Sequence, residues 1–340
     1  MARSMRHAAA LFVSFLLFSC VTVSAAGAAL TPQQRADRAS GYVAAHQSDN
    51  GSFPAFSPIG STADAVMAFV AAGVGETPVH DAIGYLRRQT ARGSVDTIGL
   101  KAKVALAVEA GGLNAANFGG HSLLGEITET QRLTGRFGNA SVLDQALATL
   151  AIAAATGEYD ADAVTWLVRA QCPDGGWQFD RPHASTEGRH CRDTSDPNDF
   201  FLSDTNTTAY VLMAVEPSGR GYDHNPFAFL TTIRDAAAAP SGGGWGYTWG
   251  FTTTDANSTA LVIQAYEAAG RPLPDGSLAA LRRLQYRCGA FAFSWTGNGR
   301  RTGPDVGASI GATPGILRKP LPVTGPVAGE PPARACDAPA

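Results

Sequence analysis

One short turn recurs along the chain: a Gln, a gap of a few residues, and then Gly-x-aromatic. It is found at residues 47–53, 131–137, 171–177 and 285–291, and residues 243–245 repeat it without the Gln. A helical stretch comes before most of these turns, and an Ala-rich apolar stretch follows them. Units of this kind cannot bury their apolar faces alone and are typical of repeat architectures. The chain is therefore expected to form one large helical domain.

An Asp marks the second helical stretch of each unit. The six markers are Asp64, Asp96, Asp144, Asp204, Asp255 and Asp305. An Asp at the start of an apolar run is an N-cap signal. The segments that follow, such as 209–212 and 260–263, are too apolar for an exposed helix, so the second helices should form a buried inner wall. Six such hairpins can stack as a solenoid or close into a ring, and the residue pattern alone does not choose.

The Gln-x(2 to 4)-Gly-x-Trp or Phe turns resemble the QW signature of terpene cyclases, over about residues 33–318. Terpene cyclases and protein prenyltransferases share a ring of helical hairpins. The resemblance therefore implies an all-α fold, a single α/α toroid (α6/α6 barrel) of about six helical hairpins. The predicted organisation is a signal peptide at 1–29, the toroid domain at 30–320 and a Pro-rich C-terminal tail at 321–340.

The N-terminal residues predict export. Arg3 and Arg6 precede an apolar run over 8–23, and small residues fill 24–29, as in a secretory signal peptide. No later stretch approaches the roughly 20 apolar residues that a membrane span needs. Without residues 1–29 the chain keeps 24 Lys plus Arg against 29 Asp plus Glu. A secreted, soluble protein with no membrane span is expected, and its negative charge argues against a nucleic-acid partner.

Four cysteines remain after export, namely Cys172, Cys191, Cys288 and Cys336. An even number in an oxidising compartment predicts two disulfides. Closeness in sequence favours Cys172 with Cys191, which leaves Cys288 with Cys336. A structural zinc site is the alternative, and the absence of any C-x-x-C spacing argues against it.

The resemblance also shows where an acid motif should stand. Class II terpene cyclases open one inner helix with D-x-D-D-T-A, and the matching sextets here, 204–209 and 255–260, carry Asn206 and Asn257 where the acid belongs. A neutral amide cannot deliver a proton. Asp204 and Asp255 are thus expected to be N-caps and only weak catalytic candidates. No D-D-x-x-D magnesium motif occurs, and a disulfide explains Cys191 beside His190 and Asp193 better than a zinc site does, so no cofactor is expected to be required.

Aromatic residues alternate after three of the turns, which places each set on one face of an extended segment. The turn residues Trp177, Trp245 and Phe291 should pack between hairpins. The others, together with the two Asn residues, are candidates for ligand binding: Phe179, Tyr247, Trp249, Phe251, Phe293, Trp295, Asn206 and Asn257. The long, charged insertion over 178–203 is a further candidate for binding.

These features favour a binding protein over an enzyme. Segments 255–270 and 311–320 are similar to the secreted transcobalamin and intrinsic-factor branch of the superfamily. That resemblance implies capture of a corrinoid (cobalamin-like) or another flat apolar small molecule. Those carriers close over cobalamin with a small β domain, whereas only a Pro-rich tail follows Pro320 here. Either a separate chain supplies the lid, with a membrane uptake protein as a further possible partner, or the ligand is different.

Two alternatives stay open at the level of sequence. The first is an exported terpene-cyclase-like enzyme that acts on an apolar substrate with Asp204 or Asp255 as a single acid. The second is a structural or protein-interaction scaffold. Fold analogy alone does not decide among these three functions.

Overall fold

The computed structural model describes residues 29–179, 191, 202–332, 334 and 336. The chain divides into two compact units, Met1–Leu30 and Thr31–Ala340, and the second is considered from here on. The predicted signal peptide and most of the 178–203 insertion, with His190 and Asp193, lie outside the described residues. No helix in the described part of the chain combines the length and the apolar character needed to cross a membrane.

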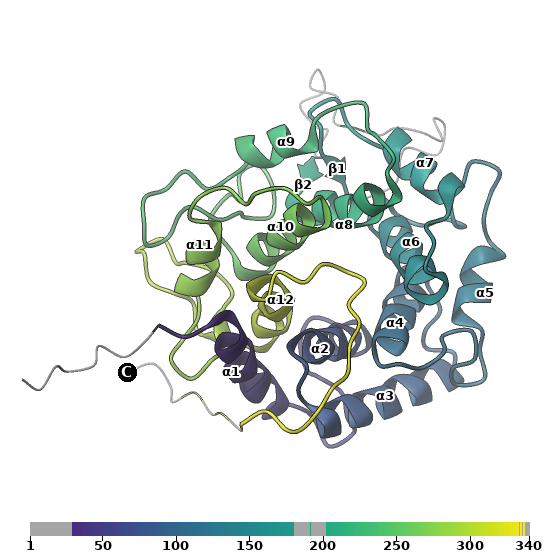
Figure 1. The fold of residues 1–340 in the computed structure, drawn as a ribbon, viewed down its shortest axis with the longest axis horizontal. Helices are drawn as coiled ribbons and strands as arrows, with labels where there is room; N and C mark the ends of the chain where they lie inside the picture. The colour runs from purple at the N-terminus through teal and green to yellow at the C-terminus, as the bar shows by residue number, and fades with distance from the viewer. Residues whose placement is uncertain (1–28, 180–190, 192–201, 333, 335, 337–340) are drawn as a thin grey trace, which may run out of the picture. The chain divides into compact units, whose positions relative to one another are not determined.

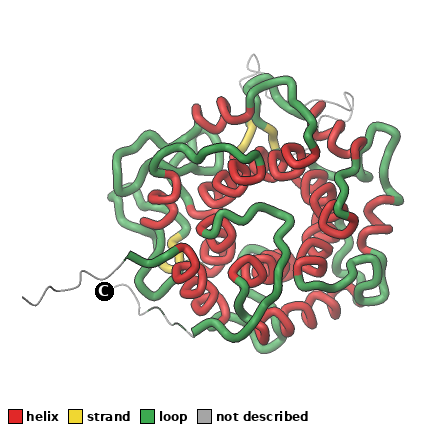
Figure 2. The backbone as a smooth tube through the Cα atoms, viewed as in Figure 1, coloured by secondary structure: helices red, strands yellow, loops and turns green. Residues whose placement is uncertain are grey.

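Helices alternate between an inner and an outer layer around a common centre (Figures 1 and 2). The inner helices are α2 (Pro58–Ala72), α4 (Ile98–Ala110), α6 (Val142–Thr156), α8 (Thr205–Val215), α10 (Ala256–Ala268) and α12 (Val306–Ile316). The outer helices are α1 (Pro32–Ala44), α3 (Glu76–Ala91), α5 (Leu123–Thr128), α7 (Ala161–Arg169), α9 (Pro226–Thr232) and α11 (Ser277–Arg283). Consecutive inner helices contact one another and α12 contacts α2, so the inner layer is closed. The predicted all-α toroid of six hairpins is confirmed.

Short strands and one 3-10 helix complete the described elements. β1 (Trp177–Gln178) pairs antiparallel with β2 (Ser203–Asp204), with Trp177 opposite Asp204. β3 (Phe291–Ala292) pairs with β4 (Pro304–Asp305) in the equivalent way. The 3-10 helix η1 (Glu216–Ser218) follows α8. Each strand pair joins a turn to the first residue of its inner helix.

The inner helices are buried because they are apolar over most of their surface. In α2 every residue from 65 to 72 is buried. A helix that is hydrophobic all round belongs in a core, where its neighbours replace water on each face. The predicted buried inner wall is confirmed.

Where the repeated turn contains its Gln, that side chain bonds one hairpin to the next. Gln171 Nε2 donates to Gly175 O within its own turn, at 2.9 Å, and to His224 O just before α9, also at 2.9 Å. Gln285 makes the corresponding pair of bonds, and its outside partner is Arg35 O in α1, at 2.9 Å. The last hairpin is thereby bonded to the first. The repeat was visible in the sequence because each Gln satisfies backbone carbonyls at a junction.

The turn aromatics fill the space between neighbouring hairpins. Trp177, Trp245 and Phe291 are fully buried. The indole of Trp177 donates to Leu167 O at 2.7 Å, and that of Trp245 donates to Leu230 O at 2.7 Å. Their predicted packing role is confirmed.

Three of the six marker Asp residues cap their helices, and three do not. Asp204, Asp255 and Asp305 accept from backbone N–H groups of Thr207, Ser258 and Ala308 at 2.7, 2.7 and 2.6 Å. In the first three inner helices the caps are instead the hydroxyls of Ser57, Thr97 and Ser141. Asp96 directly precedes its N-cap, and Asp144 accepts from Ser141 N at 3.4 Å in a capping box, so these two mark helix starts without being the N-cap residue. Asp64 was wrongly placed as a helix start. Asp64 lies in the second turn of α2, which leaves its carboxylate free for another role.

Both predicted disulfides are present, Cys172–Cys191 and Cys288–Cys336. After α12 the chain turns back and crosses the ring at the end of the inner helices, as the yellow segment of Figure 1 shows. Residues 318–332 are called the C-terminal strap below. The strap falls in the same compact unit as the ring.

Candidate functional site

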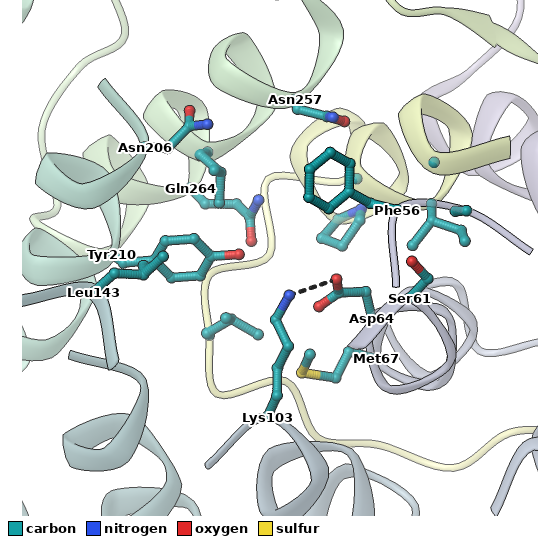
Figure 3. A pocket seen from close by; sticks show the side chains of 17 residues that line it. Phe56, Ser61, Asp64, Met67, Lys103, Leu143, Asn206, Tyr210, Asn257 and Gln264 are labelled. Atoms are coloured by element: carbon teal, nitrogen blue, oxygen red, sulfur yellow. Dashed lines mark hydrogen bonds and ion pairs between the residues drawn. The ribbon is translucent and has the colours of Figure 1, made fainter. Parts of the chain in front are cut away.

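A cavity of about 330 Å³ lies inside the ring, among the inner helices. Its polar wall comes from the first turns of α8 and α10, which carry Asn206 and Asn257, and from the second turns of α2 and α4, which carry Asp64 and Lys103. Figure 3 shows Asp64, Lys103 and Tyr210 facing one another, with Asn206 and Asn257 farther along the same cavity. The cavity thus collects polar groups that are far apart in the sequence.

An ion pair stands at the centre of the polar wall. Lys103 Nζ lies 2.8 Å from Asp64 Oδ2, and the two side chains keep 24% and 31% of their surface accessible. Burial lowers the pKa of Lys103, but the Asp64 carboxylate acts in the opposite direction, and the net result is a raised pKa. Lys103 therefore stays an ammonium group at neutral pH. Because the two charges are opposite, the pair gives the cavity no net charge.

Tyr210, in the second turn of α8, points its hydroxyl toward this pair (Figure 3). Burial raises the pKa of Tyr210 to about 12. The phenol is therefore protonated at neutral pH and is a hydrogen-bond donor. Gln264 of α10 also lines this part of the cavity, and its Nε2 donates to Ala260 O at 3.2 Å.

The two Asn residues offer acceptors that the protein does not use. Asn206 Oδ1 and Asn257 Oδ1 are both buried and accept no hydrogen bond within the described structure. Buried polar atoms normally have a partner, so each such atom calls for an explanation. Hydroxyl groups of a ligand in the cavity would supply the donors.

The rest of the wall is apolar. Met67, Leu143, Leu261 and Ile310 line it from the inner helices, and Leu321 lines it from the strap. Apolar walls with a few convergent polar groups are the usual composition of small-molecule sites.

The aromatic candidates lie beside this cavity rather than in it. Phe179, Tyr247, Trp249, Phe251 and Phe293 are exposed, and Trp295 is half-buried. Tyr247 O accepts from Thr205 N and Phe293 O from Ala256 N, both at 2.8 Å. These residues therefore flank the N-termini of α8 and α10, next to the two Asn residues. None of the six is a cavity-lining residue, and their role in binding stays a prediction.

Asp204 and Asp255, the weak catalytic candidates, have unusual carboxyl groups that do not line the cavity. Burial raises the pKa of Asp204 to about 7 and that of Asp255 to about 6, against the lowering effect of the backbone N–H groups that they accept from. Both are buried at helix N-termini, away from the cavity lining. Their geometry is that of caps.

Sequence reasoning missed the three residues at the centre of the site, Asp64, Lys103 and Tyr210. A usable signal existed for two of them. Asp64 is the one charged residue of α2, and Lys103 lies among the Ala and Val residues of α4; a charged residue is almost never buried unless it is paired. Nothing in the sequence shows that the two meet, because that depends on how α2 and α4 face each other.

Comparisons with known proteins bear on the fold. No protein-family model matches the chain, and no curated protein matches it in sequence. The fold is similar to that of an inactive variant of the alpha-1,6-mannanase GH76A of Salegentibacter sp. HEL1_6, solved in complex with alpha-1,6-mannotetrose. The TM-score is 0.55 and the sequence identity 11%, over 86% of this chain and 100% of that chain. At this identity the likeness establishes the shared α/α toroid.

The comparison corrects the functional expectation. The expectation of a protein that carries a corrinoid or another flat apolar molecule was wrong, because the similar ring is that of an enzyme bound to an oligosaccharide. The cavity gives the physical reason, since a lining that includes an ion pair, a phenol and unpartnered amide oxygens does not suit an apolar ligand. The family resemblance holds for the toroid, and the comparison supports neither prenyl chemistry nor cobalamin binding.

Proposed function

We propose that this chain is a carbohydrate-active enzyme that binds a neutral glycan in the central cavity. The observation that carries the proposal is the Asp64–Lys103 ion pair with Tyr210 beside it (Figure 3), in a cavity that Asn206 and Asn257 also line with unpartnered amide oxygens. A sugar presents many hydroxyl groups, each of which donates one hydrogen bond and accepts others. Carboxylate, ammonium, phenol and amide groups together match both roles.

The charge of the cavity favours a neutral glycan over an anionic one. Lys103 is the cationic side chain of the lining, and it is already paired with Asp64. A phosphorylated or carboxylated sugar would need an unpaired cation to replace the water that it loses. The likeness to a mannanase with bound alpha-1,6-mannotetrose supports an uncharged oligosaccharide.

Asp64 is the group best placed to act on a glycosidic bond. Positive charge develops on the sugar ring when such a bond breaks, and a fixed carboxylate stabilises it. Most glycoside hydrolases pair two carboxylates, whereas Asp64 is the single carboxylate among the described residues that line the cavity. In the hydrolysis proposed, one water molecule is consumed: its hydroxyl bonds to the sugar carbon and its proton goes to the departing oxygen. Tyr210, kept protonated by its raised pKa, can donate a hydrogen bond to that oxygen as the bond breaks.

Secretion belongs to the same proposal. Two disulfides form readily in an oxidising compartment and are rare in the cytosol. Polymeric glycans are met outside the cell, and the signal-like N-terminus predicted from sequence fits such a location.

The proposal is tested by calorimetric titration with a panel of neutral oligosaccharides that includes alpha-1,6-mannotetrose, followed by mass spectrometry of the reaction products. Asp64→Asn should abolish product formation while leaving the fold intact. The matched control is Asp305→Asn, which changes an exposed cap on the same inner layer and should leave activity unchanged. If no neutral glycan binds, or if Asp64→Asn retains full turnover, the proposal fails.

A further inference from the structure

The C-terminal strap lies across one end of the cavity (Figure 1). Leu321, near its start, is buried and lines the cavity, and Leu321 N donates to Met213 Sδ at 3.4 Å. Met213 lies in the last turn of α8. The contact therefore places Leu321 at the end of the ring where the inner helices finish.

Anchors on other inner helices hold the strap across that end. Lys319 Nζ donates to Ala71 O in the last turn of α2, at 2.6 Å, and Arg318 forms an ion pair with Glu267 in the last turn of α10. With α8, three separate helices around the ring are bridged.

The far part of the strap is fixed by backbone bonds to the turn between α2 and α3. Ala328 N donates to Gly73 O at 3.2 Å, and Gly75 N donates to Gly329 O at 2.9 Å. The Cys288–Cys336 disulfide then attaches the chain beyond the strap to the turn before β3. The strap is thus held near its start and near its end, and Leu321 is the strap residue that lines the cavity.

From this closure we infer that the site binds the end of a glycan chain and not an internal stretch of it. The inference rests on the proposed function. An internal stretch must leave the site in two directions, whereas the strap covers one end of the ring in the described part of the chain. The way in is the end where Asn206 and Asn257 lie.

The size of the cavity agrees with this. Ligand pockets usually measure about 300 to 1,000 Å³, and the 330 Å³ here is at the lower end. One or two sugar rings can enter, with the rest of the chain outside. Leu321 would contact the terminal ring.

The test compares alpha-1,6-mannotetrose, or whichever neutral oligosaccharide binds best, with two derivatives that carry a bulky aromatic label on the reducing or on the non-reducing end. We expect one label to weaken binding at least about tenfold, which is about 1.4 kcal/mol, and the other to change it little. Equal binding of both labelled forms and of a doubly labelled form would overturn the inference and leave the proposed function standing. Absence of binding by any unlabelled glycan would remove the proposed function and the inference with it.

A pair of strap variants gives a second readout. Leu321→Ala makes the cavity deeper at the strap. It should therefore recover part of the affinity that is lost when the glycan carries the label that weakens binding. Val323→Ala truncates another buried strap residue that does not line the cavity, and it should recover none. Melting temperatures report whether both variants fold. Equal effects of the two on the labelled glycan would contradict a floor made by Leu321.

Discussion

A methyl group added at Gly311 would lie 2.4 Å from Asn257 Oδ1. The missing side chain at 311 therefore leaves room for the Asn257 amide between α10 and α12. A side chain at 311 would push this amide aside. A packing detail of the ring thereby sets the geometry of a proposed ligand group.

Gly311→Ala should displace this amide and weaken glycan binding by about tenfold, or about 1.4 kcal/mol. Titration with the best-binding oligosaccharide measures the change. Gly307→Ala is the matched control, because Gly307 also lines the cavity from α12 but an added methyl meets neighbours at 3.4 and 3.5 Å. In the control the new Ala should raise helix stability by about 0.5 to 1 kcal/mol and leave affinity unchanged. Equal affinities in the two variants would show that Asn257 does not contact the ligand.

The ion pair gives a second prediction. Lys103→Met leaves the Asp64 carboxylate without its partner in a partly enclosed site, and this should lower the free energy of unfolding by about 1 to 3 kcal/mol. Adding Asp64→Leu removes the stranded charge and should recover most of that loss. Neither the Lys103→Met variant nor the double variant should bind the glycan. Chemical denaturation and titration together separate the two effects, and binding by the double variant would contradict a role for the pair in recognition.

The ring was predictable because its rules are local. Each Gln and each turn aromatic satisfies or fills a junction between adjacent hairpins, so the repeat leaves a mark at every copy, as at Gln171 and Trp177. The apolar inner helices and both disulfides follow from composition and spacing in the same way. Closure of the ring was the exception: the Gln285 to Arg35 bond joins residues from the two ends of the fold, and only the family resemblance indicated it.

The site was harder to predict because its residues meet across the ring. Asp64, Lys103 and Tyr210 come from three inner helices, and no spacing rule brings them together. The sequence pointed to Asn206 and Asn257 because they stand where related cyclases have an acid. The structure shows that both line the cavity and that their side-chain oxygens accept no hydrogen bond from the described residues. The marker Asp residues did not identify the N-caps of the first three inner helices. The caps there are Ser57, Thr97 and Ser141, and a rule that looks for Asp alone overlooks a nearby Ser or Thr.

Substitution of Trp177 and of Trp249 should separate a role in packing from a role in ligand binding. Trp177→Ala removes a fully buried ring and its bond to Leu167 O, and it should lower the free energy of unfolding by about 3 to 5 kcal/mol. Trp249→Ala changes an exposed side chain and should alter stability by no more than about 0.5 kcal/mol. If sugar rings outside the cavity stack on the exposed aromatics, Trp249→Ala should weaken binding of a tetrasaccharide more than that of a disaccharide. An equal effect on both lengths would place Trp249 outside the binding path.

The carboxyl group of Asp204 predicts how stability depends on pH. Its pKa is raised from 3.8 to about 7 in the folded protein, chiefly by burial. A raised folded pKa means that the folded state holds the proton more tightly than the unfolded state does. The stabilising contribution is therefore complete below about pH 4 and is lost as the pH rises toward and through 7. The difference between the two pKa values corresponds to at most about 4 kcal/mol.

Asp204→Asn should remove most of this pH dependence. Asn is as good an N-cap as Asp and can still accept from Thr207 N, but it carries no ionisable group. The variant should match the parent protein near pH 4 and exceed its free energy of unfolding at pH 8, as measured by urea denaturation across that range. Asp305→Asn, at an exposed cap of α12, should shift stability by no more than about 0.5 kcal/mol at any pH.

Because Asp255 is also buried, with a pKa raised to about 6, the free energy of unfolding of the Asp204→Asn protein should keep a smaller dependence on pH between pH 4 and 6. A profile for Asp204→Asn that runs parallel to that of the parent protein over the whole range would show that Asp204 does not hold a proton in the folded state.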